Sequence, residues 1–330
     1  MAALSDWEPT ATHARLELRA ALLARTRGFF AARGVLEVDT PILVNAPVTD
    51  VHIHSARVEL AREFGSGAGG RAPAFYLHTS PEYAMKRLLA AGSGDIYQIC
   101  HVVRALERGR LHNTEFTLVE WYRLGLSLEA LMEEVEALVR VLLGASAPRL
   151  RGERLSYACA FERELGLDPF DAPIEALARA ARAAGIATPS SDRDELLDAL
   201  MAIRVGPALG RAALTFVHGY PSSQAALARL DPRDARAAQR FELYCEGIEL
   251  ANGFHELADA AEQRSRFERD IAERRRRALP AAAADGRLLA ALEAGLPDCC
   301  GVALGFDRTL MLAAGAQRIE EVLSFPTERA

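Results

Sequence analysis

Two strand-like runs on either side of an arginine-rich stretch constrain the fold of this chain more than any other feature. The runs are DIYQICHVV at 95–103 and EFTLVEWY at 115–122, and both are rich in β-branched and aromatic residues. The stretch between them contains a glycine and polar turn formers, so the three segments predict a long antiparallel hairpin. A hairpin needs no crossover helix, which favours an antiparallel sheet over alternating βαβ units.

The rest of the chain supports this fold class. Helical spacing is expected at 15–33, 80–90, 128–142, about 150–212 and 259–278, and strand-like runs at 34–43, 213–221, 240–254 and 299–304. The order predicts an α+β fold in which helices flank an antiparallel sheet. We expect residues 1–330 to form a single domain, with a small helical insertion at about 150–212.

Composition excludes several classes of protein. No run of eighteen apolar residues is present, so we expect no membrane-spanning helix. The five cysteines show no CxxC spacing, which argues against a structural zinc or a disulfide framework and favours a cytoplasmic protein. A formal net charge of −6 argues against a broad RNA-binding surface.

The stretch VRALERGRLHNTEF, residues 103–116, is the first candidate part of a binding site. Arginine is well suited to phosphate because its planar fork donates two parallel hydrogen bonds and stays charged. Arg104 lies at the end of a strand, Asn113 supplies a neutral donor, and Phe116 offers an aromatic face to a base. The alternative interpretation is a solvated hairpin tip.

Two further segments carry candidate site residues. In GIELANGFHEL, Glu249 and Glu256 can converge if the strand bends, and paired carboxylates suit Mg²⁺ or a substrate amine. The alternative is two surface glutamates near a β-bulge. In GVALGFDRTLML, glycines permit close backbone approach and Arg308 opens a helix, although a core element with a surface Asp307–Arg308 pair is the alternative.

Together these segments resemble the catalytic domain of class II aminoacyl-tRNA synthetases. GVLEVDTPIL resembles motif 1, which builds the dimer interface of that family, VRALERGRLHNTEF resembles motif 2, and GVALGFDR resembles motif 3. SPEYAMKRLL, HNTEFTLVEWY and ELANGFHEL are similar to the lysine-specific branch. Within it, the similarity extends over nearly the whole chain to free-standing ligases that modify elongation factor P. No room for an anticodon-binding domain precedes residue 15, and Ala303 stands where the tRNA synthetases of this branch carry glycine.

The resemblance implies a function. It implies an enzyme that activates (R)-β-lysine as an adenylate, with ATP and Mg²⁺ as cofactors and pyrophosphate as a product. The activated group then passes to a lysine ε-amine of elongation factor P, with release of AMP. The implied partners are elongation factor P, lysine or β-lysine, and a second copy of the chain that docks through the helix and strand at 15–41. No tRNA and no membrane are expected.

The resemblance also implies roles for individual residues. Arg104 and Arg308 are the expected catalytic residues, on the α- and γ-phosphates. The expected ATP-binding residues are Arg104, Ala105, Leu106, Asn113, Phe116, Glu249, Leu250, Gly305 and Arg308. The expected substrate-binding residues are Ser80, Pro81, Glu82, Tyr122, Glu256 and Ala303. The expected metal ligands are Glu249 and Glu256.

One residue departs from the family pattern. Leu106 stands where motif 2 carries a glutamate that contacts ATP, and Glu107 comes one position late. Two alternatives to the ligase therefore stay open. The first is a stand-alone enzyme that aminoacylates tRNA or a small metabolite. The second is a catalytically silent paralogue that binds a ligand or a partner. Lys86, the only lysine in the chain, lies in a helical context that favours a structural role.

Overall fold

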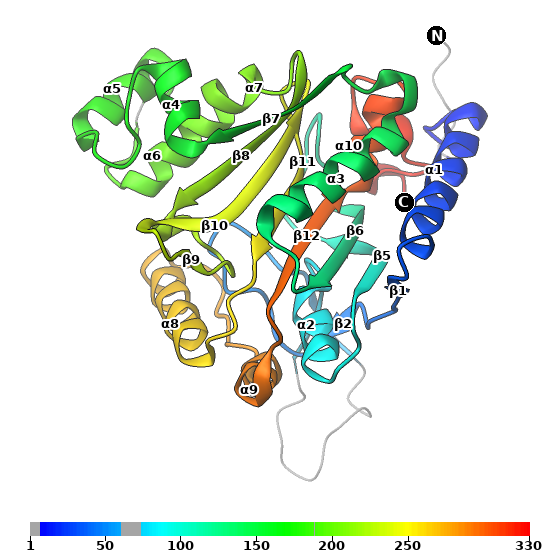
Figure 1. Cartoon of the computed structure of the whole chain (residues 1–330), viewed down its shortest axis with the longest axis horizontal. Helices are drawn as coiled ribbons and strands as arrows, with labels where there is room; N and C mark the ends of the chain where they lie inside the picture. The colour runs from blue at the N-terminus through cyan, green and yellow to red at the C-terminus, as the bar shows by residue number, and fades with distance from the viewer. Residues whose placement is uncertain (1–6, 61–73, 188) are drawn as a thin grey trace.

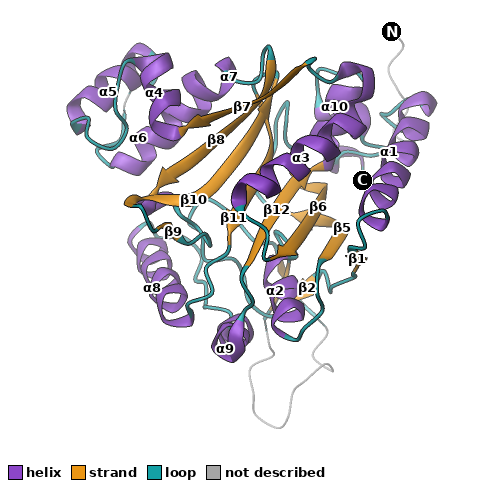
Figure 2. Ribbon diagram, viewed as in Figure 1, coloured by secondary structure: helices purple, strands orange, loops and turns teal. Residues whose placement is uncertain are grey.

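A mixed β-sheet forms the centre of the molecule, with helices around it (Figures 1 and 2). The computed structural model describes residues 7–60, 74–187 and 189–330. The main sheet has the strand order β1-β5-β6-β12-β11-β10-β8-β7, and β9 pairs with β10 beside this path. A small second sheet has the order β2-β4-β3. No helix of the described residues is both long enough and apolar enough to cross a bilayer.

The strands of the main sheet are β1 (Leu36–Glu37), β5 (Ile96–Val103), β6 (Glu115–Leu124), β7 (Leu150–Ser156), β8 (Ala213–Pro221), β9 (Leu230–Asp231), β10 (Asp234–Cys245), β11 (Ile248–His255) and β12 (Cys299–Gly305). Those of the second sheet are β2 (Leu43–Val44), β3 (Arg57–Val58) and β4 (Phe75–Leu77). The helices are α1 (His13–Ala31), α2 (Glu82–Ala90), α3 (Leu128–Leu143), α4 (Tyr157–Leu165), α5 (Ile174–Ala183), α6 (Arg193–Leu200), α7 (Gly206–Ala208), α8 (Ala260–Arg276), α9 (Gly286–Gly295) and α10 (Phe306–Ala313).

The predicted hairpin is confirmed. Strands β5 and β6 pair antiparallel from Ile96 opposite Tyr122 to Val103 opposite Glu115. Strand β6 then pairs with β12, which places the end of the hairpin beside the start of α10. The segment that resembles motif 2, at 103–116, therefore lies beside the segment that resembles motif 3, although about two hundred residues separate them.

The two faces of the central strands differ in what they contact. On β6, Val119 and Trp121 join the core that packs against α1, α3 and α10. The alternate residues Leu118, Glu120 and Tyr122 line a cavity instead. Because successive side chains of a strand point to opposite sides, one face of the sheet builds the core while the other builds the site.

Two features of the fold differ from the sequence-based expectation. The sheet is not purely antiparallel, because β1 runs parallel to β5 and β7 runs parallel to β8 at its two edges. The segment expected to be helical from about 150 begins with strand β7, and its helices start at Tyr157. The run at 150–156 alternates weakly and only its pairing with β8 makes it a strand. Figure 1 shows α4, α5 and α6 gathered at one corner beyond β7 and β8.

Helix α1 buries one side and exposes the other. Its buried side chains are Leu22, Thr26, Phe29 and Phe30. The helix expected at 15–33 is confirmed, although on it Ala20 is exposed and Leu16 is half-buried. After the helix, β1 leaves Leu36 55% exposed.

Candidate functional site

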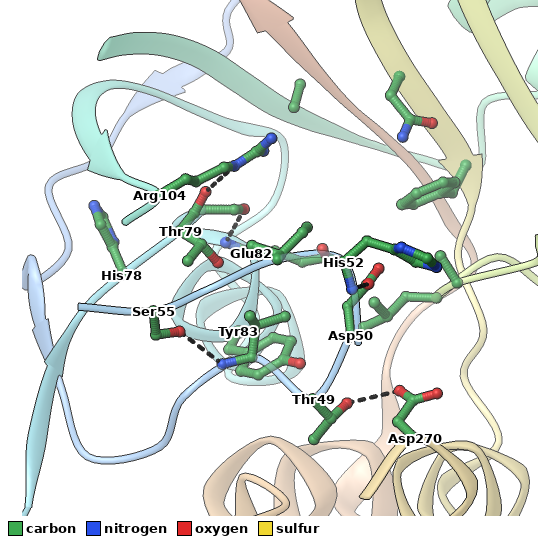
Figure 3. Close-up of a pocket in the computed structure, with 18 of the residues that line it drawn as sticks. Thr49, Asp50, His52, Ser55, His78, Thr79, Glu82, Tyr83, Arg104 and Asp270 are labelled. Carbon is green, nitrogen blue, oxygen red and sulfur yellow. Dashed lines mark hydrogen bonds between the residues drawn. The ribbon is translucent and has the colours of Figure 1, made fainter. Parts of the chain in front are cut away.

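A cavity of about 1440 Å³ opens on the face of the sheet opposite α1, α3 and α10. All of the predicted site residues line it except Ala105 and Leu106. The loop at 45–55 closes one side of the cavity, because the Thr49 hydroxyl donates to Asp270 of α8 at 2.8 Å (Figure 3). The cavity lining brings together residues of the three candidate segments VRALERGRLHNTEF, GIELANGFHEL and GVALGFDRTLML, which are far apart in the sequence.

Arg308, in the first turn of α10, reaches across to the hairpin. Its Nε donates to the Leu111 carbonyl at 3.2 Å, its Nη1 to the Glu249 carbonyl at 2.9 Å and its Nη2 to His112 Nε2 at 2.6 Å. Burial and the charge of Arg308 lower the pKa of His112, so the imidazole is neutral near pH 7 and accepts this bond. These bonds fix the guanidinium in a cavity wall, where it suits an anionic ligand.

Arg104 lies at the start of the loop that follows β5. Its Nε donates to the Thr79 carbonyl at 3.3 Å, and its guanidinium carbon stands 5.1 Å from the centre of the Phe116 ring. Figure 3 shows the first of these contacts in the cavity wall. A cation held beside an aromatic face forms a two-part surface for a phosphate next to a base.

Glu107 and Leu106 differ in where their side chains lie. Leu106 is 71% exposed and does not line the cavity, whereas Glu107 does line it and forms an ion pair of 3.2 Å with Arg104. Both residues lie beyond the end of β5, so strand alternation no longer dictates which way they point. A carboxylate is thus present at this wall although the sequence position differs.

We expect Leu106→Glu to change the rate of ATP–pyrophosphate exchange by less than about threefold, because an exposed side chain has little effect on a buried site. Glu107→Gln should raise the KM for ATP about tenfold, since it removes one charged partner of Arg104. Glu115→Gln, at an exposed glutamate of the same hairpin, is the matched control and should behave as wild type. A tenfold gain of exchange in Leu106→Glu would contradict this assignment.

The outer part of the hairpin is tied to the C-terminal segment. Asn113 is buried, and its Oδ1 accepts a hydrogen bond from the Thr327 amide at 3.1 Å. Arg108 pairs with Glu328, and Arg110 donates to a backbone carbonyl near the C-terminus at 3.2 Å. Arg108 and Arg110 are exposed and lie outside the cavity lining. For these two arginines the solvated-tip interpretation is correct, whereas Arg104 belongs to the cavity.

At the other end of the cavity, three buried or nearly buried carboxylates surround one lysine. Lys86 lies 2.7 Å from Glu82 Oε1 and 2.6 Å from Glu256 Oε2. Glu120, from the middle of β6, accepts hydrogen bonds from the hydroxyls of Ser80 at 2.7 Å and Tyr122 at 2.8 Å. We call Glu82, Lys86, Glu120 and Glu256 the amine-end cluster. With all four ionised, its net charge is negative.

Burial controls the protonation of this cluster. It raises the pKa of Glu120 to about 8, and the nearby Glu82 adds to the rise. Burial also raises the pKa of Glu256 to about 8, although Lys86 opposes it. A cationic ligand would favour the ionised carboxylates, so ligand binding and proton release are coupled here.

Strand β12 forms the wall beside the cluster. Its Gly301 lies opposite Tyr122 and its Ala303 lies opposite Glu120 in the register with β6. A Cβ on Gly301 would stand 2.4 Å from Glu256 Oε1, so only glycine fits there without a shift of the neighbours. Ala303 lines the cavity with its single methyl group.

The two carboxylates expected to share a metal belong to different neighbourhoods. Both Glu249 and Glu256 face the cavity, because a register shift between β10 and β11 changes the alternation between them. However, Glu256 is paired with Lys86, while Arg308 lies 3.6 Å from Glu249. Burial and the nearby Glu242 raise the pKa of Glu249. Glu242 is itself paired with Arg240 at 2.5 Å, so Glu249 has the weakest contact with a cation of these three carboxylates and is the best placed for a metal ion.

Sequence reasoning missed several charged residues of the cavity. Glu120 and Glu242 each interrupt an otherwise apolar strand, and that interruption was the available signal. Glu242 accepts hydrogen bonds from Arg240 at 2.5 Å and from the Tyr244 hydroxyl at 2.6 Å. The alternative interpretation, a surface pair of Asp307 and Arg308, is wrong, because Asp307 is buried and its carboxylate accepts a hydrogen bond from the Thr117 amide at 2.7 Å.

Comparison with known proteins agrees with this geometry. Residues 4–329 match the family model described as tRNA synthetases class II (D, K and N). A Vibrio cholerae protein named elongation factor P–(R)-beta-lysine ligase is 48% identical over 329 residues, 99% of this chain and 99% of that protein. Proteins of the same name are 46% identical in Salmonella arizonae and 47% identical in Klebsiella pneumoniae, in each case over 333 residues and 100% of both chains.

Proposed function

Since the chain belongs to the class II aminoacyl-tRNA synthetase family, we propose that it is an ATP-dependent ligase that joins (R)-β-lysine to elongation factor P. The amino acid would first be activated as an adenylate. It would then pass to a lysine ε-amine of the factor, as the names of the relatives suggest. Action on a translation factor would take place in the cytoplasm.

The observation that carries the proposal is the opposite charge of the two ends of one cavity. Arg104 and Arg308 supply fixed guanidinium groups at one end. At the other end, three carboxyl groups, those of Glu82, Glu120 and Glu256, surround the single ammonium group of Lys86, and a cationic ligand favours their ionised forms. A diamino acid carries two ammonium groups and one carboxylate, so it would place its amines in the amine-end cluster and its carboxylate toward the arginines.

In the first step, a carboxylate oxygen of the amino acid attacks the α-phosphorus of ATP. The bond between the α-phosphorus and the bridging oxygen breaks, and pyrophosphate leaves. The attacking carboxylate is already ionised, so no general base is needed, and the protein contributes position and charge stabilisation. Arg104 would hold the α-phosphate, Arg308 the γ-phosphate, and Phe116 would stack on the adenine.

In the second step, a neutral lysine ε-amine attacks the carbonyl carbon of the adenylate. An amide forms, AMP leaves with the bonding electron pair, and the nitrogen loses one proton. Lysine is protonated near neutral pH in water, so the amine must lose its first proton before attack.

Glu249 is the carboxylate that best fits a divalent cation, because its contact with Arg308 is 3.6 Å, whereas Glu242 is paired with Arg240 at 2.5 Å. When bound, Mg²⁺ would neutralise charge on the phosphates. Glu256 is paired with Lys86 at 2.6 Å and lies outside the proposed metal site.

The test is ATP–pyrophosphate exchange with the purified chain and (R)-β-lysine, followed by intact mass measurement of elongation factor P. We expect exchange and a mass gain of one β-lysyl group. An analogue that lacks the distal amine is the control and should support little exchange. Absence of exchange with every lysine isomer, at concentrations that bind ATP, would reject the proposal. Charging of tRNA instead would favour the stand-alone aminoacylating enzyme.

A homodimer through residues 15–41 is part of the proposal. Leu36 in this segment is 55% exposed, and Ile42, directly after the segment, is 42% exposed, which leaves apolar surface for a partner. Sedimentation of the purified chain tests it. Dimers should appear, and Leu36→Glu should shift them toward monomers.

A further inference from the structure

Lys86 is the least expected member of the amine-end cluster. It is the only lysine in the sequence, it is 1% exposed, and it lies one helical turn after Glu82 on α2. Lysine is almost never fully buried unless it is paired. Here it is paired twice, with Glu82 of its own helix and with Glu256 at the end of β11. One ammonium group therefore joins two carboxylates from elements far apart in the sequence.

Charged and polar groups from several elements lie near Lys86. Glu82 comes from α2, Glu120 and Tyr122 from β6, Glu256 from the residue after β11, and Cys299 from β12. Helix α9 contributes apolar side chains to this region. In the described part of the chain, Lys86 is the only cationic side chain in ion-pair contact with these carboxylates.

Lys86 stays charged in this setting. Burial alone would lower its pKa, but the Glu256 and Glu82 carboxylates outweigh burial and raise the pKa of Lys86. The cluster thus holds three carboxyl groups and one permanent positive charge. Without the lysine, the three carboxyl groups would lose their only nearby positive charge in a poorly hydrated space, and one more of them would hold a proton near pH 7.

We infer that Lys86 is a positioning residue that acts as a built-in counter-ion between Glu82 and Glu256, so that the cluster, once a diammonium substrate has ionised its carboxyl groups, carries two net negative charges opposite two ammonium groups. The inference deepens the proposed function and depends on it for the identity of the ligand. Lys86 does not contact the reacting carboxylate. It holds the Glu82 and Glu256 side chains in place before the amino acid arrives.

Loss of Lys86 should change the number of protons released when the ligand binds. If Lys86 becomes methionine, one carboxyl group should hold an extra proton near pH 7, and a diammonium ligand must displace that proton to bind. For each additional proton released on binding, the association constant rises by a further factor of about ten per pH unit. A lysine that only filled space would not change this slope.

The experiment compares wild type with Lys86→Met by isothermal titration with (R)-β-lysine at pH 7 and pH 8, in two buffers of different ionisation heat. Lys86→Met should bind about 10- to 100-fold more weakly at pH 7, and should release about one more proton per site than wild type. Arg179→Met is the matched control, because Arg179 is an exposed cation on α5 that does not line the cavity. Equal proton release in wild type and Lys86→Met would overturn the inference.

Two further measurements keep the test independent of folding and of the ligand. If Lys86→Met does not fold, Lys86→Met/Glu256→Gln removes the unpaired charge as well and should fold, with weak binding but the proton release of wild type.

In the absence of ligand, an extra carboxyl group with a raised pKa makes stability fall as pH rises. The urea midpoint of Lys86→Met should therefore fall more steeply than that of wild type between pH 6 and pH 8. This result does not require β-lysine to be the substrate, and parallel midpoint curves would contradict the counter-ion role.

Discussion

Arg308→Ala is expected to reduce ATP–pyrophosphate exchange by about a thousandfold, because removing a fixed positive donor from a phosphoryl-transfer site typically costs two to three orders of magnitude or more. The guanidinium of Arg308 is oriented by Leu111, His112 and Glu249 before any ligand binds. Its loss therefore removes a preorganised charge. Binding of the amino acid alone should change little, because the amine-end cluster lies at the other end of the cavity.

Arg308→Lys distinguishes charge from geometry. Lysine keeps the charge but lacks the planar fork, so exchange should fall to an intermediate level, about 10- to 100-fold below wild type. Arg318→Ala, at an exposed arginine paired with Glu320, controls for loss of one positive charge and should leave exchange unchanged. Exchange by Arg308→Ala within tenfold of wild type would remove Arg308 from the catalytic residues.

Gly301→Ala is expected to raise the KM for (R)-β-lysine by at least about a hundredfold. Its new Cβ would stand 2.3 Å from Tyr122 Cε1 and 2.4 Å from Glu256 Oε1, closer than carbon atoms tolerate. Tyr122 is buried and holds Glu120, while Glu256 holds Lys86, so any shift disturbs the amine-end cluster. Overpacking of this kind also costs about 1–3 kcal/mol of stability. The KM for ATP should stay within about threefold of wild type, since the ATP end makes no contact with this Cβ.

Gly286→Ala is the matched control for this substitution. A Cβ on Gly286 would meet nothing within 4 Å, and the residue lies at the start of α9. Its kinetics and its melting temperature should equal those of wild type. If Gly301→Ala keeps a normal KM for (R)-β-lysine while its melting temperature falls, the glycine serves packing and not the amino-acid pocket.

Local patterns in the sequence were sufficient for the elements that build the ATP end. The β-branched and aromatic residues of 95–103 and 115–122 predicted the hairpin, and it is confirmed by the register of β5 with β6. The strand, turn and helix around Gly305 were also predicted and are confirmed as β12 and α10. Both results depend on local residue preferences, which the chain displays without reference to its neighbours.

Other features depended on contacts between distant segments. The parallel pairing of β7 with β8 could not be read from 150–156, because that run has little intrinsic strand character. The inward direction of Glu107 depends on its ion pair with Arg104 in the loop after β5. Glu249 and Glu256 face one cavity because of a register shift, which a single sequence does not reveal.

The sequence by itself determined the family, the order of the elements and most of the residues that line the cavity, because motif spacing and side-chain periodicity are properties of the chain alone. Only the tertiary structure decided which of those residues act on one another. It paired Lys86 with Glu82 and Glu256. It also buried Glu120 between the hydroxyls of Ser80 and Tyr122. Ionisation and charge balance depend on distances of a few ångströms between remote segments, and those distances exist only after folding.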